Sequence, residues 1–561
     1  MSSDGLLTAP GLTNRAKKDD SDGPGAPLLG SGSGAAIESV VAASGTGWRE
    51  VDATTVQEVC LLWALAWPLF FQTLANEIQL VITTALYGHL GETDLAAAND
   101  TTSMVWFVLV FVMGAQNALY TMAPQAVGAG SRRQVGVVLQ VTLFWTVVVL
   151  GPLTTIACYF MGDGLVAFGM TNASDPVEQE AVRSFSHASA WWMMPYIVVT
   201  TVTTWLDAIS VVQAPSFISA LFAIAGVGLA WLLMYEGFEI SSDQEPGAGS
   251  EEGGFALAVP RLGLNGFAYA SAVTYTLQGL VLYLWVFRYR KQHSHVWFGW
   301  QPKRVFHRGL NNRFIMLALP MMLQYALNSW TSTIFQLFMS RRSELYAAAY
   351  GVCSTYVSTG GSVSNALFMA VSTRVGNCLG EGDTHRAKRA SLVGFIFAAT
   401  AGAIISTLIF VFRRPLAHFY TPAESVSVLA IDAAPFVVLY YFTNSAVWGL
   451  WAVMQGQMRT CYPATVICIG MWLISVPLAY AAVTYDLGDR YLGGLNPLST
   501  LWACCVIGEG ITFVLMAGAI VFADWDKIAH EAIETATMGE DEEEDYDSEG
   551  AKAVGAGGSV Q

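Results

Sequence analysis

The sequence predicts an all-α integral membrane protein whose twelve transmembrane helices form two six-helix lobes, related as parallel repeats. Three observations carry this prediction: few charged residues, long uncharged runs, and a polar motif that occurs twice. Charged residues make up 12% of the chain and hydrophobic residues 54%, whereas soluble domains hold about 25% charged residues. This composition is typical of a chain surrounded by a lipid bilayer.

The uncharged runs set the number of helices. Each is longer than the roughly 20 residues that a helix needs to cross the hydrocarbon core, and the strands of a β-barrel would not give such runs. Nine runs hold no charged residue: 101–131, 134–162, 208–235, 264–287, 314–340, 345–373, 390–412, 433–458 and 460–485. Three further runs hold one acid each: 59–91 with Glu77, 184–207 with Asp207 and 499–523 with Glu509.

The repeated motif predicts that the chain is duplicated. Residues 68–76 read PLFFQTLAN and residues 320–328 read PMMLQYALN, 252 positions later. A proline and two amides at four-residue spacing lie on one helix face, and burying that face in lipid would be costly. We therefore expect a polar cavity between the halves. The matched residues are Pro68, Gln72 and Asn76 in the first copy, and Pro320, Gln324 and Asn328 in the second.

The repeat and the charges divide the chain into five parts. Six predicted helices precede a basic loop and six follow it, so the repeats are parallel and related by an axis along the membrane normal. The parts are a disordered N-terminal tail (1–52), an N-terminal lobe (53–290), a basic inter-lobe loop (291–312), a C-terminal lobe (313–525) and an acidic tail (526–561). The turns GAGSRR and GEGDTHR extend the repeat, because Gly128 and Gly380 are again 252 apart.

Basic loops predict the orientation in the membrane, because cytoplasmic loops are enriched in Lys and Arg. The inter-lobe loop, Arg132–Arg133 and Arg386–Arg389 fall on one side, which makes both termini cytoplasmic. Arg341–Arg342 and Arg413–Arg414 fall on the other side, against the rule. The membrane is predicted to be the plasma membrane or a vacuolar or other endomembrane. The net charge of −16 lies largely in the termini, and we expect no nucleic-acid partner.

Four further segments lie at predicted helix ends: GHLGETDLAAA (88–98), PQAVGAG (124–130), STRVGNCLGEGD (372–383) and ADWDK (523–527). In these segments the chain resembles the multidrug and toxic compound extrusion (MATE) family, especially its eukaryotic branch. The resemblance covers roughly residues 55–530. It implies a twelve-helix antiporter that exports organic, often cationic, compounds by alternating access in exchange for protons or sodium ions.

The chain departs from the family at its acidic positions. The seventh helix of eukaryotic relatives reads like L-E-x-W-x-x-E, where this chain has Asn328 and Thr333. Plant relatives often carry an acid at the position of Tyr120, and prokaryotic relatives often carry an aspartate at the position of Thr83. The acids usually credited with coupling in this family are therefore absent from the matched positions.

Other acids within the spans are candidates for proton coupling, because a buried carboxyl can change its protonation when its surroundings change. Glu77 is the first choice: it lies near the middle of the first helix, where an isolated charge is costly. Glu509 lies between Gly508 and Gly510 in the last helix, so a structural hydrogen bond is an equal alternative. Asp207, at the end of the fourth helix, is a candidate gate or helix-end contact.

Polar and aromatic residues on the first, second and seventh helices are candidates for lining the substrate cavity, with interhelical hydrogen bonding as the alternative role. Pro68 and Pro320 are candidate hinges, since proline opens the helical hydrogen-bond ladder. The cavity candidates are Gln72, Asn76, Gln79, Thr83, Tyr120, Gln324, Asn328, Trp330 and Thr331.

Other classes of function fit less well. The spans contain no HExxH, GxGD-like or Ser/Lys motif and the chain no Walker motif, so we expect neither an enzyme nor an ATP-driven pump, and no cofactor or metal site. A channel, a flippase of the broader superfamily, and a sodium-coupled or uncoupled transporter of neutral or anionic solutes stay open. The favoured interpretation is an antiporter that exchanges a small organic cation, such as a xenobiotic or secondary metabolite, for protons.

Overall fold

The structure is a computed structural model that describes residues 53–168, 176–236, 238–241, 256–259, 261–289, 296–421, 423–491 and 494–537. The chain divides into two units, Met1–Gln57 and Glu58–Gln561. Only the start of helix α2 is described in the first unit, and the contacts below all lie within the second. The predicted N-terminal tail (1–52) and the acidic residues 540–549 lie outside the described residues.

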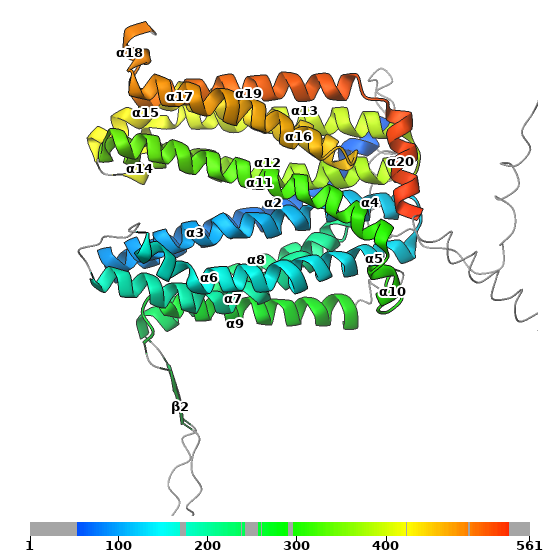
Figure 1. The fold of residues 1–561 in the computed structure, drawn as a ribbon, viewed down its shortest axis with the longest axis horizontal. Helices are drawn as coiled ribbons and strands as arrows, with labels where there is room; N and C mark the ends of the chain where they lie inside the picture. The colour runs from blue at the N-terminus through cyan, green and yellow to red at the C-terminus, as the bar shows by residue number, and fades with distance from the viewer. Residues whose placement is uncertain are drawn as a thin grey trace, which may run out of the picture. The chain divides into compact units, whose positions relative to one another are not determined.

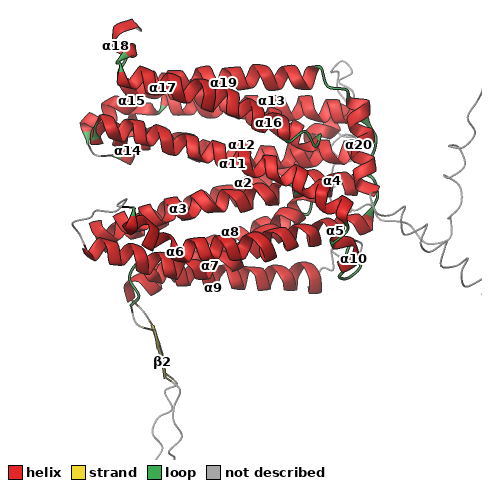
Figure 2. Cartoon of the chain, in the orientation of Figure 1, coloured by secondary structure: helices red, strands yellow, loops and turns green. Residues whose placement is uncertain are grey.

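Within the described residues, the N-terminal lobe contains six long helical runs, which Figures 1 and 2 show. A hairpin of two antiparallel strands, β1 (Phe238–Ser241) and β2 (Ala256–Val259), stands between the last two runs and pairs Phe238 with Val259. The runs are α2 (Ala53–Leu90), α3–α4 (Glu92–Asn117, Leu119–Gly128), α5–η1–α6 (Arg132–Leu143, Phe144–Leu150, Gly151–Ala167), α7 (Pro176–Ala208), α8–η2 (Gln213–Trp231, Leu232–Glu236) and α9–η3 (Asn265–Tyr283, Leu284–Tyr289).

The C-terminal lobe repeats this arrangement with six further runs, so the predicted all-α, two-lobe class is confirmed. The runs are α11 (Arg308–Arg342), α12 (Glu344–Gly380), α13 (Thr384–Val411), α15 (Glu424–Gly456), α16–η5–α17 (Cys461–Ile467, Cys468–Ser475, Val476–Thr484) and α19 (Pro497–Val521). Four short helices complete the described part: α10 (Pro302–Val305), α14 (Arg413–Tyr420), α18 (Leu487–Tyr491) and α20 (Trp525–Thr537).

Nine of the described helical runs are long and apolar enough to cross a membrane by length and composition alone. The other three, α7, α11 and α12, have the length but a more polar composition. Both α11 and α12 pack against the N-terminal lobe, α11 on α3 and α12 on α4. A helix that faces protein instead of lipid can carry polar residues, because neighbouring helices satisfy their hydrogen bonds.

The two repeated turns have the same backbone. Gly130 follows α4 with φ 74° and Gly382 follows α12 with φ 77°. Glycine is the residue that adopts this left-handed conformation without steric cost, so the sequence ends each helix at the equivalent point. After the second turn, Asp383 caps α13 by accepting a hydrogen bond from the Arg386 backbone N–H at 2.9 Å.

The two ends of the helical unit differ in charge. We call the end that carries these turns, α10 and α20 the basic end, because Arg132, Arg133, Arg304 and Arg386 lie there. The end that carries β1 and β2 is the hairpin end. Figure 1 shows α3 and α11 side by side near the basic end and diverging toward the hairpin end.

Buried apolar side chains join the lobes at the basic end. Leu62 and Leu69 of α2 pack in the same hydrophobic cluster as Val371 and Val375 of α12. Helix α20 lies across both lobes: Trp525 belongs to the cluster of the C-terminal lobe, and Ala536 belongs to the cluster that α4 and α5 form. The two lobes are therefore held together at the basic end by buried residues of the hydrophobic core.

Candidate functional site

The boundary between the lobes is closest where α4 crosses α12, and the contact is reciprocal. A side-chain carbon on Gly128 would overlap the Asn377 carbonyl oxygen, and one on Gly380 would overlap the Gln125 carbonyl oxygen. Gln125 and Asn377 are 252 positions apart, as are Gly128 and Gly380. These four residues, the α4–α12 crossing, therefore meet as symmetry mates on the pseudo-two-fold axis.

A hydrogen bond extends the crossing. The Ser372 hydroxyl donates to the Tyr120 carbonyl oxygen at 3.1 Å, and these residues are also 252 apart. Both are buried, with 0% and 1% of their surface exposed. The axis of the duplication thus runs through the contact between α4 and α12.

Gln455, at the end of α15, bridges a break in the second span. Helix α3 ends at Asn117 and α4 begins at Leu119, and the Thr121 N–H bonds to the Ala118 carbonyl oxygen, so the Asn117 carbonyl oxygen lacks its usual helical partner. The Gln455 side-chain amide donates to the Asn117 carbonyl oxygen at 2.7 Å, and the Thr121 hydroxyl donates to the Gln455 carbonyl oxygen at 3.0 Å. One residue on, the Gly456 carbonyl oxygen accepts from the Gln125 amide at 2.8 Å. Each lobe therefore satisfies backbone carbonyl groups of the other.

A buried ion pair also joins the lobes at the basic end. Glu58 on α2 accepts two hydrogen bonds from the Arg374 guanidinium on α12, at 2.6 and 2.7 Å. Their side chains are 2% and 7% exposed, and Arg386 lies 3.3 Å from the same carboxylate. A bidentate Arg–carboxylate pair fixes geometry as well as charge, so Glu58 ties the first helix to α12.

Nearer the middle of the helices, Glu77 faces the opposite lobe. The Thr73 hydroxyl donates to the Ser362 carbonyl oxygen on α12 at 3.1 Å. One turn further along α2, the half-buried Glu77 carboxyl lies beside the Ser362 hydroxyl, which has no hydrogen-bond partner among the described residues. The preferred coupling candidate therefore lies at the lobe boundary.

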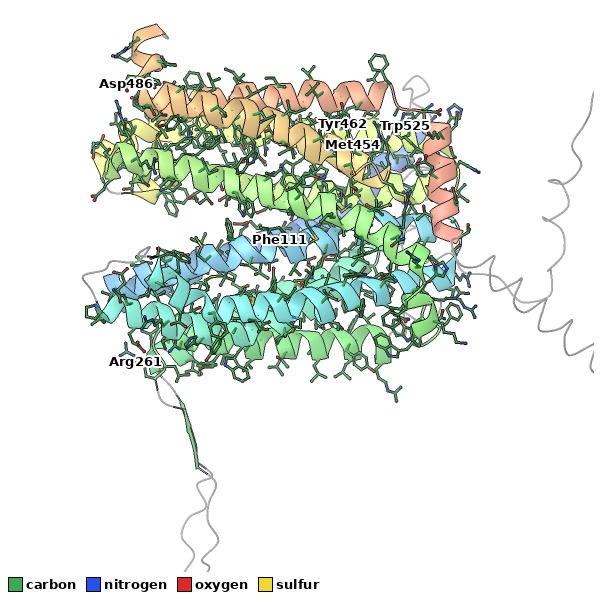
Figure 3. All side chains as sticks on the ribbon, in the orientation of Figure 1. Phe111, Arg261, Met454, Tyr462, Asp486 and Trp525 are labelled. Atoms are coloured by element: carbon green, nitrogen blue, oxygen red, sulfur yellow. The ribbon has the colours of Figure 1, made fainter. Side chains whose placement is uncertain are left out.

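Aromatic side chains of α3 and α11 make a further contact between the lobes. The Trp330 ring of α11 stacks on Phe107 of α3 with centroids 4.5 Å apart and planes 14° apart. Phe111, labelled in Figure 3, meets Trp330 edge-on at 5.9 Å. The Trp330 indole N–H has no hydrogen-bond partner in the described ranges. A flat ring is therefore already accommodated between the lobes at this position.

The structure does not bring the three candidate acids together. Asp207 is buried at the basic end of α7 and faces the Tyr120 hydroxyl, yet neither Asp207 Oδ1 nor the hydroxyl makes a hydrogen bond within the described part of the chain. Glu509 is buried within the C-terminal lobe, where the Asn444 amide of α15 donates to it at 2.8 Å. Only Glu77 lies against the other lobe.

The polar stripe of the first helix turns largely toward α8. The Ser216 hydroxyl donates to the Gln72 amide oxygen at 3.0 Å, and Gln79 lies beside Gly226. Thr83 is buried and donates to the Gln79 carbonyl oxygen at 2.7 Å. Asn76 is exposed. Gln72 and Gln79 thus contact their own lobe in this conformation, and Asn76 remains accessible.

The stripe of the seventh helix is arranged differently. Gln324 is 0% exposed, and neither its amide oxygen nor its amide nitrogen has a hydrogen-bond partner in the residues that the structure describes. Thr331 is buried and bonded to the Leu327 carbonyl oxygen at 2.7 Å, and Asn328 is exposed. Pro68 and Pro320 lie inside α2 and α11, which continue as helices through both prolines.

Several residues that make these contacts have no local signature in the sequence: Glu58, Phe107, Ser362, Asn444 and Gln455. The repeat could have pointed to the crossing, since Gly128 and Gly380 occupy matched turns. It could not show that these glycines contact the opposite copy.

Comparison with known proteins identifies the architecture. A family model described as MatE matches residues 68–232 and 320–481, more than half of the chain. This chain belongs to the MatE family. The two matched ranges begin at Pro68 and Pro320, where the repeated motif begins, so one range falls in each lobe. The predicted resemblance to MATE proteins is confirmed.

Relatives come from animals, plants and bacteria. Multidrug and toxin extrusion protein 2 of Oryctolagus cuniculus is 25% identical over 85% of this chain and 72% of its own length. Protein DETOXIFICATION 17 of Arabidopsis thaliana is 24% identical over 87% and 94%. NorM of Aliivibrio fischeri is 22% identical over 80% and 94%. The chain is thus a multi-pass membrane transporter of the multidrug and toxin extrusion type, and not an enzyme.

Solved structures show the same fold. The crystal structure of the eukaryotic MATE transporter AtDTX14 matches with a TM-score of 0.72 at 21% identity, over 86% of this chain and 100% of that one. A crystal structure of a mutant of the Vibrio cholerae MATE transporter VcmN matches with a TM-score of 0.70 at 15% identity, over 85% and 100%. The MATE architecture of two six-helix lobes therefore applies to this chain.

Proposed function

We propose that this MATE protein is a secondary active antiporter that exports small organic cations in exchange for protons, by alternating access of its two lobes. The observation that carries the proposal is the position of Glu77. It is the one candidate acid that lies on the lobe boundary, beside Ser362 of the other lobe. When the lobes separate or close there, the surroundings of this carboxyl change, and so does its preference for a proton.

The conformation fits one end state of alternating access. The contacts between the lobes run from the Glu58 ion pair and the α4–α12 crossing at the basic end to the Phe107–Trp330 stack. With the basic end in the cytoplasm, as the positive-inside rule favours, this conformation is closed to the cytoplasm. Both termini are then cytoplasmic, and the membrane is the plasma membrane or an endomembrane such as that of the vacuole.

The chemistry of the boundary supports a cationic substrate. Glu77 and the exposed amides Asn76 and Asn328 offer oxygen acceptors, and Trp330 offers an aromatic face for a flat cation. We include Gln72, Gln79, Thr83, Tyr120, Gln324 and Thr331 in the proposed cavity region as residues that would be exposed in turn as the lobes move.

Transport by purified protein in proteoliposomes tests the coupling. The probes are ethidium, a flat aromatic cation, and tetraethylammonium, an aliphatic one, under an imposed pH gradient or an imposed sodium gradient. We expect Glu77→Gln to lower pH-driven uptake by at least about tenfold while substrate-for-substrate exchange continues, because exchange needs no net proton movement. Glu344→Gln, which neutralises an exposed acid at the start of α12, should leave both rates unchanged.

The rival candidates are tested in the same assay. Glu509→Gln and Asp207→Asn should retain a pH-driven component if Glu77 carries the proton. If Glu77→Gln keeps full pH-driven transport, one of these other acids is the coupling group. If transport responds to the sodium gradient alone, sodium and not the proton is the counter-ion.

A neutral or anionic substrate is the second candidate function. It is favoured by the neutral residues Asn328, Thr333 and Tyr120 at positions where relatives often hold acids. A MOP superfamily transporter from Pyrococcus furiosus, with a TM-score of 0.69 at 14% identity, is described as having a binding pocket of reverse polarity. Uptake of an organic anion in preference to ethidium would support this alternative.

The prolines of the repeated motif give a separate prediction. Replacing Pro68 or Pro320 by alanine restores a backbone N–H donor within α2 or α11 and stiffens the helix. If the helices bend there during the switch, turnover of ethidium should fall several-fold with little change in KM. Pro302→Ala, at the start of α10, is the control. If Pro68→Ala and Pro320→Ala both keep full turnover, neither proline acts as a hinge.

A further inference from the structure

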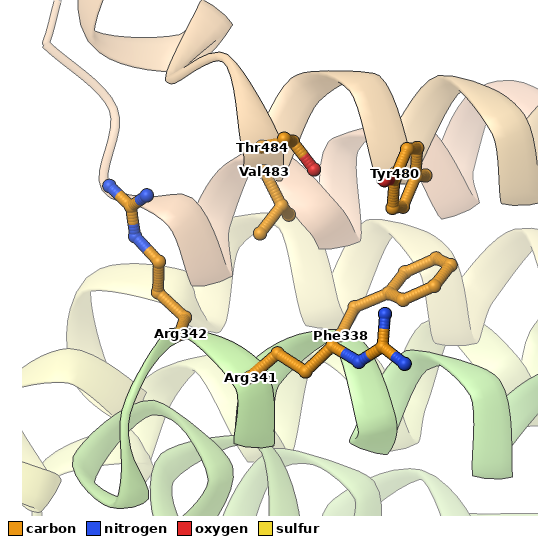
Figure 4. Close-up of a pocket in the computed structure, with 6 residues that line it drawn as sticks. All are labelled: Phe338, Arg341, Arg342, Tyr480, Val483 and Thr484. Atoms are coloured by element: carbon orange, nitrogen blue, oxygen red, sulfur yellow. The ribbon is translucent and has the colours of Figure 1, made fainter.

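A pocket in the C-terminal lobe lies outside the inter-lobe boundary. It has a volume of about 260 Å³ and opens between the last turns of α11 and α17 at the hairpin end. Figure 4 shows its six lining residues: Phe338, Arg341, Arg342, Tyr480, Val483 and Thr484. Phe338 and Tyr480 face each other across it, with ring centroids 5.5 Å apart.

The two arginines of this pocket have different partners. Arg342 forms a hydrogen-bonded ion pair with Asp486, just beyond α17. Asp486 has a φ of 49°, a left-handed conformation that Asp tolerates better than most residues. This turn brings the carboxylate to Arg342. Arg341 makes no hydrogen bond or ion pair with any residue in the described ranges.

Two hydroxyl groups line the same pocket as the Arg341 guanidinium. Tyr480 and Thr484, one turn apart on α17, line the pocket opposite Arg341. Together the guanidinium and the hydroxyls supply donors to a tetrahedral oxyanion. Arg is well suited to phosphate, because its planar fork makes two parallel hydrogen bonds.

The depth of the pocket points to a lipid. Helices α11 and α17 both end beside it, at Arg342 and Thr484, so it lies at the level where spanning helices leave the hydrocarbon. Figure 3 places Asp486 at this end of the lobe. Deeper along these two runs, Leu337 on α11 is 48% exposed and Leu473 on η5, just before α17, is 66% exposed. Leu473 lies two turns below Tyr480 on one face of its run, so an apolar surface continues inward from the charge.

We propose that this pocket binds the headgroup of an anionic phospholipid from the leaflet at the hairpin end. The phosphate pairs with Arg341 and accepts hydrogen bonds from Tyr480 and Thr484, and an acyl chain lies along Leu337, Phe338 and Leu473. This binding site gives a role to Arg341 on the side of the membrane that the positive-inside rule does not favour for arginine. It is independent of the counter-ion and the transported substrate.

Native mass spectrometry of the full-length protein in detergent micelles tests the proposal. The probes are phosphatidylglycerol and phosphatidylcholine with identical acyl chains. We expect the first phosphatidylglycerol to bind more tightly than phosphatidylcholine, and Arg341→Gln to weaken it about fivefold, the equivalent of about 1 kcal/mol. Arg341→Lys should retain part of the affinity, and the double variant Tyr480→Phe, Thr484→Val should lose affinity with its charge intact.

Arg414→Gln is the matched control, since Arg414 is exposed at the start of α14 and does not line the pocket. Excess glycerol 1-phosphate distinguishes a lipid from a free phosphate: it should not displace the lipid, because it lacks the acyl chain. Equal losses in Arg341→Gln and Arg414→Gln would overturn the site, as would equal binding of both lipids. Displacement by glycerol 1-phosphate would overturn the assignment to a lipid.

Discussion

Replacing Gly128 and Gly380 by alanine is expected to open the basic end of the transporter and reduce transport by at least about tenfold. Each new methyl group would overlap a backbone carbonyl oxygen of the opposite lobe. A backbone cannot move aside as a flexible side chain can, and overpacking typically costs about 1–3 kcal/mol per site. Since two sites act on one interface, the strain is large enough to move a two-state equilibrium by about two orders of magnitude.

Labelling of Cys378 with a maleimide measures this opening. Cys378 is 0% exposed and follows Asn377 of the crossing, whereas Cys461 is exposed and serves as the internal reference. The ratio of labelling at Cys378 to that at Cys461, read by peptide mass spectrometry, should rise in the double variant. Ethidium transport in proteoliposomes should fall in parallel.

Gly351→Ala is the control, because Gly351 also lies in α12 but a side-chain carbon there meets nothing within 4 Å. It should transport and label as the wild type does. A Gly128→Ala, Gly380→Ala protein that transports normally with Cys378 still protected would show that the crossing does not hold the basic end closed.

Breaking the Glu58–Arg374 pair from one side is expected to have the second large effect. Glu58→Gln leaves the Arg374 guanidinium buried without its carboxylate, and loss of one partner of a buried pair costs about 3–5 kcal/mol when the other charge stays buried. Opening the basic end hydrates Arg374 and relieves this cost. We therefore expect Glu58→Gln to raise Cys378 labelling and slow the return to the closed state.

A double-mutant cycle separates this effect from a general loss of structure. Removing both charges, as Glu58→Gln with Arg374→Gln, leaves no orphaned ion, so the double variant should lie closer to the wild type than either single variant. The neighbouring Arg386, 3.3 Å from the same carboxylate, should lessen the effect of Arg374→Gln but not that of Glu58→Gln. Additive losses in the double variant would contradict coupling between Glu58 and Arg374.

The sequence predicts the helices better than it predicts their neighbours. Uncharged runs locate all the spanning helices, including α11 and α12, whose composition is more polar than that of a lipid-facing span. The spacing of Gln72 and Gln79 places both on one face of α2. Which helix that face meets depends on packing, and the structure turns both residues toward α8.

The boundary is harder to predict for the same reason. The hydrogen bond between Gln455 and Asn117 joins residues 338 positions apart. It depends on the end of α3 at Asn117, and neither proline nor glycine stands at that position to indicate it. Glu77 stands out in the sequence because a charge in a span is costly. Its neighbour Ser362 does not, because serine is common in membrane helices.

The interruption at Ala118 also distinguishes the two copies of the duplication. Ala118 keeps right-handed helical dihedral angles, with φ −58° and ψ −24°, so what changes there is the hydrogen bonding. The second span relies on Gln455 of the opposite lobe for the Asn117 carbonyl oxygen, whereas its counterpart α12 is one continuous helix from Glu344 to Gly380. Separation of the lobes would therefore remove a partner of the backbone in the second span and none within α12.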